Sequence, residues 1–150
     1  MSFAACLLAL TLTIYTEAGG EGDKGMELVA DVIATRVTDE RYPDTACKVV
    51  LQKSQFDWTK RLKHKDFNGL LTMQKKVFKT RPQTSQEKAA YAQAMFLASK
   101  VMKPGYKPKY RYTHFYSGTD RPYWAKGKKA FKYRNHYFLK LHKPKGKSNE

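Results

Sequence analysis

One glutamate in this sequence is well placed for acid chemistry. Glu17 follows a mostly apolar run from Phe3 to Ile14 and precedes a glycine-rich segment, residues 19–22. A carboxyl group at such a junction is partly desolvated, which raises its pKa and keeps it protonated near neutral pH. A protonated carboxyl group can donate the proton that a glycosidic leaving oxygen requires. On spacing alone, a solvated glutamate at a helix end is the simpler interpretation.

The segments on either side of Glu17 predict two consecutive helices. Ser2 can cap a first helix that runs to about Thr16, and three glycines in four residues must break it. A second helix begins near Asp23, and Glu21 just before it can cap the free N–H groups. Apolar residues recur in the second helix at three- and four-residue steps and mark its buried face: Met26, Val29, Ala30, Ile33 and Val37.

The rest of the chain is predicted to be helical first and extended later. Residues 41–44 cap a short helix that contains Cys47, Val50 and Leu51, and residues 52–59 form a loop. Further helices cover residues 67–78 and a segment from Ser85 to the stop at 104–105. Alternating aromatic residues give 110–116 and 131–142 the character of strands. The predicted fold class is α+β, a mainly helical single domain over residues 1–142, with a small late antiparallel sheet or hairpin and a loose basic tail at 143–150.

Length, composition and charge restrict the class of protein. A chain of 150 residues with 41% hydrophobic residues can form one domain with a buried core. No apolar run approaches the ~20 residues of a membrane-spanning helix, so we expect no stable membrane insertion. The net charge of +16 is uneven, with −4 in residues 1–50, +8 in 51–100 and +12 in 101–150. This distribution predicts a chemical site in the first third and an anion-binding surface in the remainder.

The cysteines and the N-terminal segment set expectations about the compartment. Cys6 and Cys47 are too few for a disulfide scaffold or a four-ligand zinc site. We expect two small apolar side chains in a reducing compartment, with a single bridge as the alternative. The apolar start has no basic region before it and no small-residue cleavage site directly after it. It is therefore expected to be a buried helix rather than a cleavable signal peptide, with a short membrane tether as the alternative.

Several blocks of this sequence resemble the spore-cortex-lytic (SleB-like) cell wall hydrolases. That family opens with the motif E-A-R-G-E and an alanine- and valine-rich helix ending in N-R-V, and residues 13–37 are similar to this opening. Similar blocks then follow in the family's order at 41–45, 49–50, 55–59, 89–102, 113–116, 122–125 and 135–138. The ordered set covers nearly the whole chain.

The resemblance implies a lysozyme-like fold and cleavage of the glycan strand of peptidoglycan, with Glu17 as the catalytic acid and no cofactor or metal. Glu17 would protonate the oxygen between N-acetylmuramic acid and N-acetylglucosamine and then act as base on the muramic 6-hydroxyl, as in a lytic transglycosylase. Muramidase-type hydrolysis is the alternative. It usually needs a second carboxylate, for which Glu21, Asp23 and Asp57 are the candidates.

The resemblance also suggests which residues bind the sugar and where the protein acts. Trp58, Tyr116, Tyr123 and Trp124 can stack on pyranose rings, although core packing is the more frequent role of such residues. His114, Asn135 and His136 can bond sugar hydroxyls or N-acetyl groups, although a structural role is more frequent for a single histidine. The small size is similar to that of a phage lysis protein. We therefore expect a monomer that stays in the host cytoplasm before lysis and binds peptidoglycan and anionic envelope polymers.

Two departures from the family pattern and two rival functions remain. Gly19 replaces the motif arginine, and Tyr133-Arg134 replaces an apolar–glycine pair, so the turn there is expected to differ. A basic nucleic-acid-binding module fits the charge, but no motif of that class is present and no nucleic-acid partner is expected. An N-acetylmuramoyl-L-alanine amidase could take metal ligands from the four histidines, yet their spacing matches no known ligand motif: His64, His114, His136 and His142.

Overall fold

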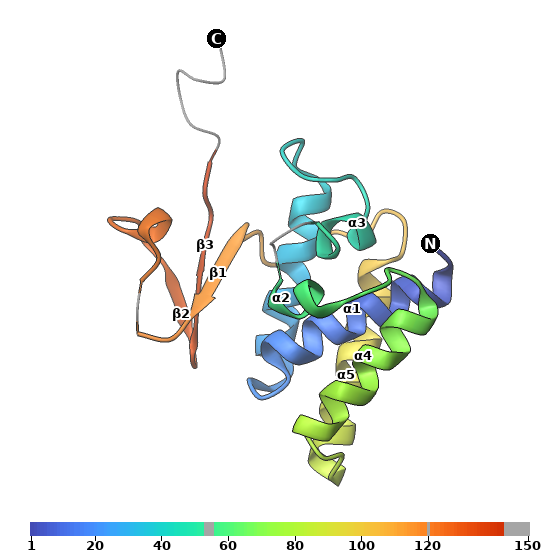
Figure 1. The fold of residues 1–150 in the computed structure, drawn as a ribbon. Coiled ribbons are helices and arrows are strands. Elements are labelled where there is room, and N and C mark those ends of the chain that lie inside the picture. The colour runs from blue at the N-terminus through green and yellow to red at the C-terminus, as the bar shows by residue number, and fades with distance from the viewer. Residues whose placement is uncertain (53–55, 120, 143–150) are drawn as a thin grey trace.

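The computed structural model describes residues 1–52, 56–119 and 121–142, and the side chain of Asp57 is not among the parts described. The predicted basic tail at 143–150 therefore lies outside the described residues. At the centre is helix α1, Phe3–Ala18, which packs against α2, α3, α4 and α5 (Figure 1). Ser2 caps α1 as predicted, because its hydroxyl accepts the N–H of Ala5 at 3.1 Å. Side chains around most of α1 are buried, as expected of a helix that is apolar on all sides.

The other helices enclose α1 and begin at polar caps. Helix α2 spans Gly22–Val37, α3 spans Ala46–Val50, α4 spans Phe67–Thr80 and α5 spans Ser85–Val101. The side chains of Thr45, Asp66 and Thr84 accept N–H groups at the starts of α3, α4 and α5. The expected loop at 52–59 is wrong in part, because Asp57–Arg61 form the 3₁₀ helix η1.

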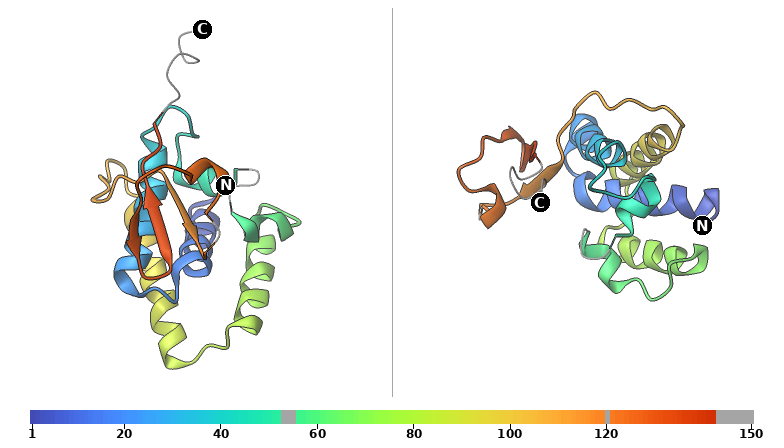
Figure 2. Two further views of the ribbon diagram at one scale, coloured as in Figure 1. Left: turned by 90° about the vertical axis from the view of Figure 1, so that its left-hand side faces the viewer. Right: turned by 90° about the horizontal axis from the view of Figure 1, so that it is seen from above.

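A small antiparallel sheet lies at one side of the helices (Figures 1 and 2). Strands β1, His114–Ser117, and β2, Phe131–Tyr133, flank the central β3, His136–Leu139. A short 3₁₀ helix η2, Tyr123–Ala125, lies between β1 and β2. The predicted fold class, mainly helical with a small late antiparallel sheet, is confirmed.

The strand predicted over residues 110–116 begins later than expected, at His114. The carboxylate of Asp31, fully buried on α2, accepts the backbone N–H groups of Lys109 and Tyr110 at 2.9 and 3.0 Å. It also accepts the Tyr106 hydroxyl at 2.7 Å. The bond from Tyr110 takes the N–H group that a strand beginning at this residue would offer to a neighbouring strand.

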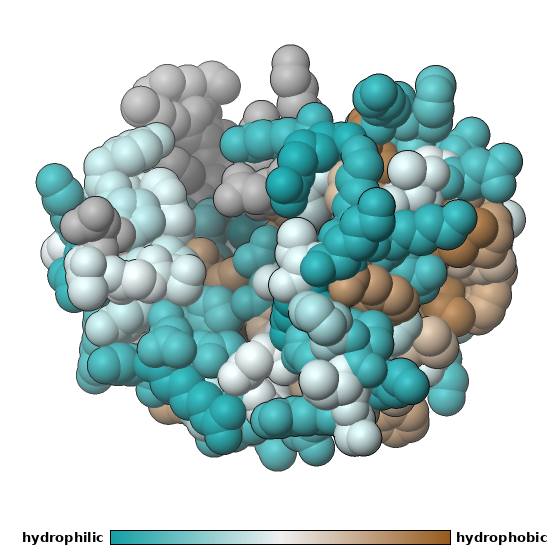
Figure 3. Space-filling view, turned by 60° about the horizontal axis from the view of Figure 1, so that its bottom comes forward, coloured by the Kyte–Doolittle hydropathy of each residue, from teal (hydrophilic) through white to brown (hydrophobic). Residues whose placement is uncertain are grey.

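The surface is mostly hydrophilic on the face drawn in Figure 3, with hydrophobic residues gathered toward one edge. The exposed large hydrophobic side chains include Met1, Phe3, Met95 and Phe96. Within the described residues, no helix is both long and apolar enough to cross a membrane.

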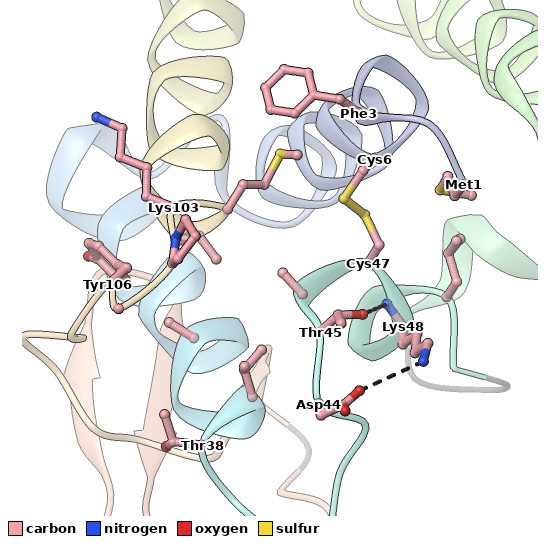
Figure 4. A pocket seen from close by; sticks show the side chains of 18 of the residues that line it. Met1, Phe3, Cys6, Thr38, Asp44, Thr45, Cys47, Lys48, Lys103 and Tyr106 are labelled. Carbon is pink, nitrogen blue, oxygen red and sulfur yellow. Dashed lines mark hydrogen bonds and ion pairs between the residues drawn. A yellow bond between two sulfur atoms is a disulfide. The ribbon is translucent and has the colours of Figure 1, made fainter.

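Cys6 and Cys47 form a disulfide, so the expectation of two reduced cysteines is wrong. The bridge joins α1 to α3, whose packing brings the two Cα atoms to 5.6 Å although 41 residues separate them in sequence. It lies beside an apolar cavity of about 920 Å³ between the start of α1, α3 and the segment after α5 (Figure 4). A disulfide indicates an oxidising compartment, which also corrects the expectation of a reducing one.

Candidate active site

The junction between α1 and α2 carries both glutamates of the opening motif. Glu17 lies half-buried in the last turn of α1, and Glu21 is the residue before α2. The N–H of Gly19 donates to the Tyr15 carbonyl at 2.8 Å, and the N–H of Glu21 donates to the Ala18 carbonyl at 2.9 Å. Gly22 then adopts a φ of +76°, a conformation that favours glycine. The glycine-rich segment therefore folds as a tight turn that fixes where the two carboxyl groups emerge.

Glu21 does not cap α2, contrary to the prediction, because its side chain makes no hydrogen bond to that helix. Only 8% of Glu21 is exposed, and its carboxylate reaches across to the turn between β2 and β3. There Oε1 accepts the N–H of Asn135 at 3.0 Å, and Oε2 accepts its side-chain amide at 3.4 Å. Glu21 thus joins the α1–α2 junction to a turn that is more than 100 residues away in sequence.

His136 completes this contact between the helices and the sheet. Its ring is buried, and Nδ1 lies 3.3 Å from Oε1 of Glu21 without the geometry of a hydrogen bond. Burial lowers the pKa of His136, and the nearby Glu21 carboxylate opposes this shift only in part. The imidazole is therefore neutral at neutral pH, and the contact is polar rather than ionic.

The turn that presents Asn135 and His136 differs from the family pattern at Arg134, as the sequence indicated. Arg134 has a φ of +50°, in the left-handed region where glycine has no steric cost. This turn divides the predicted strand 131–142 into β2 and β3, with Tyr133 paired to His136. The Arg134 guanidinium lies over Gly22, where its Nη1 is 3.0 Å from the position that a Cβ would take.

Three of the predicted aromatic ligands, Tyr116, Tyr123 and Trp124, lie together at the face of the sheet opposite His136. We call them the aromatic group. Tyr116 pairs with Tyr137 across β1 and β3, and their rings stack at 4.9 Å. Trp124 packs edge-on against Tyr116 at 5.9 Å and lies 5.2 Å from the His114 ring. Tyr123 is 84% exposed beside them. Because neighbouring residues on a strand point to opposite faces, this group lies on the face opposite His136.

His114 is held neutral by its surroundings. Burial, followed by the charges of Arg36 and Arg41, lowers its pKa to about 4, against a smaller opposing effect of Asp39. Its Nδ1 lies 2.8 Å from the hydroxyl of Thr113. Its Nε2 lies 3.5 Å from the Tyr42 hydroxyl, so both ring nitrogens have partners within the protein.

Trp58 lies in the core, apart from the other predicted ligands. It is 3% exposed, and its indole N–H donates to the hydroxyl of Thr13 at 3.0 Å inside the helical body. The structure therefore divides the predicted residues into three groups. Glu17 and Glu21 share a turn on which Asn135 and His136 dock, the aromatic group with His114 lies on the far face of the sheet, and Trp58 packs in the interior.

Sequence reasoning missed two residues of this region. Tyr137 stacks on Tyr116, and the alternation of aromatic residues in the two late strands was the signal that could have paired them. Arg81 contacts the last turn of α1 from the end of α4, and no local spacing could have shown this because 66 residues separate it from Tyr15. Among the described residues, no three His, Cys, Asp or Glu side chains lie close enough together to hold a metal ion.

Comparison with known proteins identifies the family. The Cell Wall Hydrolase family matches residues 20–139, which is more than half of the chain. No curated protein and no solved structure matches, so the lysozyme-like fold implied by the resemblance stays a prediction. The matched region includes Glu21, Asn135 and His136 and begins three residues after Glu17. The chain belongs to the cell wall hydrolases, enzymes that act on peptidoglycan.

Proposed function

We propose that this protein cleaves the glycan strand of peptidoglycan between N-acetylmuramic acid and N-acetylglucosamine, with Glu17 as the single catalytic carboxyl group. Glu17 donates its proton to the bridging oxygen as the bond to the muramic anomeric carbon breaks. It then takes the proton of the muramic 6-hydroxyl while that oxygen bonds to the same carbon. The products are a free glucosamine end and a 1,6-anhydromuramic end, and no water is consumed.

The state of Glu21 is the observation that carries this proposal. Its carboxylate is buried and accepts two hydrogen bonds from Asn135, so it serves to hold the β2–β3 turn. Of the other candidates for a second carboxylate, Asp23 is exposed in the first turn of α2, and the side chain of Asp57 lies outside the described parts of the structure. Glu17 lies at the same tight turn as Glu21 but on the last turn of α1. A mechanism that needs one carboxyl group fits this division of roles better than one that needs two.

The aromatic group on the far face of the sheet supports a role in holding the polymer. Tyr116, Trp124 and the exposed Tyr123 offer ring faces and edges, and the His114 ring packs beside Trp124. Because this group and His136 lie on opposite faces, we assign these residues to sugar units away from the bond that is cleaved. In this proposal Trp58 stabilises the core.

Mass spectrometry of digested peptidoglycan tests the reaction. We expect anhydromuramic ends from the wild-type protein. Glu17→Gln keeps the shape of the side chain but removes the transferable proton, so activity should fall by about 10²-fold or more with the thermal unfolding midpoint unchanged. Asp23→Asn is the matched control, because it removes an exposed carboxylate six residues away, and its activity should stay within about twofold of wild type.

Each contrary result overturns a defined part of the proposal. Reducing muramic ends would show hydrolysis, and a large loss in Asp23→Asn would indicate a second catalytic carboxylate. Freed peptides would show an amidase. Near-wild-type activity of Glu17→Gln would remove Glu17 from the mechanism whatever the product.

A further inference from the structure

Arg81 occupies the space beside Gly19, the position where the family motif has an arginine. A Cβ added to Gly19 would lie 2.7 Å from Nη2 of Arg81 and 2.5 Å from the Tyr15 carbonyl oxygen. Both distances are shorter than ordinary van der Waals contact. The Tyr15 ring would also lie 2.9 Å away, so position 19 has no room for a side chain between Tyr15 and the Arg81 guanidinium.

Three groups hold the Arg81 guanidinium in place: the Tyr15 carbonyl, the Glu87 carboxylate and the Tyr15 ring. Nη1 donates to the Tyr15 carbonyl at 2.9 Å, while Nε and Nη2 donate to the two carboxylate oxygens of Glu87 at 2.8 and 3.0 Å. The Cζ atom of Arg81 also lies 4.0 Å from the centre of the Tyr15 ring. A guanidinium held by a two-pronged carboxylate bond and an aromatic ring has little freedom to move.

Tyr15 and Glu87 are themselves joined. The buried Tyr15 donates its hydroxyl to Oε2 of Glu87 at 2.8 Å, and it accepts the Gln83 amide at 3.1 Å. The bond from Arg81 is the largest cause of the lowered pKa of Glu87, so this carboxylate is ionised at neutral pH. The network thus ties the α4–α5 connection to the last turn of α1.

The last turn of α1 is the turn that carries Glu17. Residues 15 and 19 lie on one side of a helix and residue 17 lies about 200° around from residue 15, on the opposite side. Arg81 therefore contacts this turn on the side of residues 15 and 19, which is opposite the side that carries Glu17. A displacement of about 1 Å at a reacting group can cost about 10²-fold in rate, so the rigidity of this turn matters to the proposed acid.

We propose that Arg81 is a positioning residue, which fixes the C-terminal turn of α1 and with it the direction of Glu17. This inference rests on the proposed role of Glu17. The sequence lacks a guanidinium at position 19, and Arg81, the residue after α4, brings one to the same turn.

Variants at position 81 test this by separating rate from binding. Arg81→Ala should lower kcat on soluble glycan by roughly 10- to 100-fold and change KM by less than about twofold, since it disturbs the direction of the acid rather than the sugar contacts. Arg81→Lys keeps the charge but loses the two-pronged geometry, so kcat should fall while the unfolding midpoint changes little. Lys79→Ala, which removes an exposed cation two residues earlier, is the control and should match wild type.

Glu87 supplies an independent test of the same network. Glu87→Gln leaves Arg81 in the chain but removes the charged carboxylate that holds its guanidinium, so kcat should fall in this variant too. In the Arg81→Ala background the same substitution should cost clearly less, because the guanidinium that the carboxylate holds is already gone. Sub-additive losses in this double-mutant cycle are the result expected.

Three outcomes would overturn the inference. They are an unchanged kcat in folded Arg81→Lys, losses at positions 81 and 87 that simply multiply, or a loss expressed in KM alone. Should Arg81→Ala not fold, Arg81→Lys and Glu87→Gln decide the matter. If Glu17→Gln is inactive and these variants are not, the positioning role fails alone. If Glu17→Gln is active, the proposed function itself fails.

Discussion

At the scale of single residues, Arg134 shows how a departure from the family pattern is accommodated. It keeps the left-handed conformation that a glycine would adopt without strain, at the turn that delivers Asn135 to Glu21. Its guanidinium fills the space over Gly22, which also has a positive φ. The backbone of the turn therefore has a conformation that favours glycine, and the side chain adds a contact between the sheet and the α1–α2 junction.

Arg134→Gly should raise the free energy of unfolding by about 0.5–1 kcal/mol, because it removes the steric cost of a side chain at positive φ. Lys132→Gly is the matched control. Lys132 is exposed on β2 without a positive φ, so the same loss of a basic side chain there should destabilise by about 0.5–1 kcal/mol. Chemical denaturation of the three proteins measures both effects. Equal destabilisation would mean that packing of the guanidinium over Gly22 outweighs the strain.

At the scale of helices and strands, the sequence predicted those helix starts, helix breaks and strands that are determined by residues close together in the chain. Ser2 marked the start of α1, and the glycines placed the break between α1 and α2, because caps and breakers act within a few residues. The late sheet followed from aromatic alternation, but this pattern alone did not interrupt 131–142, because Arg134-Asn135 carries no glycine signal. Only the resemblance to the family indicated a turn there. Partners distant in sequence could not be predicted at all. Glu21 bonds Asn135 instead of its own helix, and Asp31 bonds residues 109 and 110, which precede the first strand.

The disulfide between α1 and α3 is another contact between residues distant in sequence, and no pattern in the sequence pairs Cys6 with Cys47. Closing a loop of 41 residues restricts the unfolded chain, and reduction should lower the free energy of unfolding by about 4 kcal/mol on the chain-entropy estimate. Denaturation with and without a reductant measures this. The variant with Cys6→Ala and Cys47→Ala should be as stable as the reduced protein and indifferent to reductant. A wild-type curve that does not shift on reduction would contradict the bridge.

At the scale of the whole molecule, charge and chemistry lie in different parts of the chain. The first third, which carries Glu17 and Glu21, has a net charge of −4, and the remaining two thirds carry the excess of positive charge. The exposed lysines and arginines of the later part include Lys126, Lys128, Lys129 and Lys132, which flank η2 and β2 near the aromatic group. This arrangement fits a basic surface that attracts an anionic polymer while the carboxyl chemistry takes place elsewhere.

Salt should therefore weaken binding to whole cell walls more than it slows the reaction itself. Attraction between exposed charges is screened beyond ~8 Å at an ionic strength of 0.15 M, so the amount of protein sedimented with walls should fall steeply between low and physiological salt. Cleavage of a short neutral glycan should change little over the same range, because its recognition depends on ring stacking and hydrogen bonds. A variant with Lys126, Lys128 and Lys129 all changed to Gln should bind walls less at low salt, with a shallower salt dependence and unchanged cleavage of the short glycan. Equal salt sensitivity for whole walls and for the short glycan would mean that screening acts at the site of cleavage. The basic surface would then not be what docks the protein on the wall.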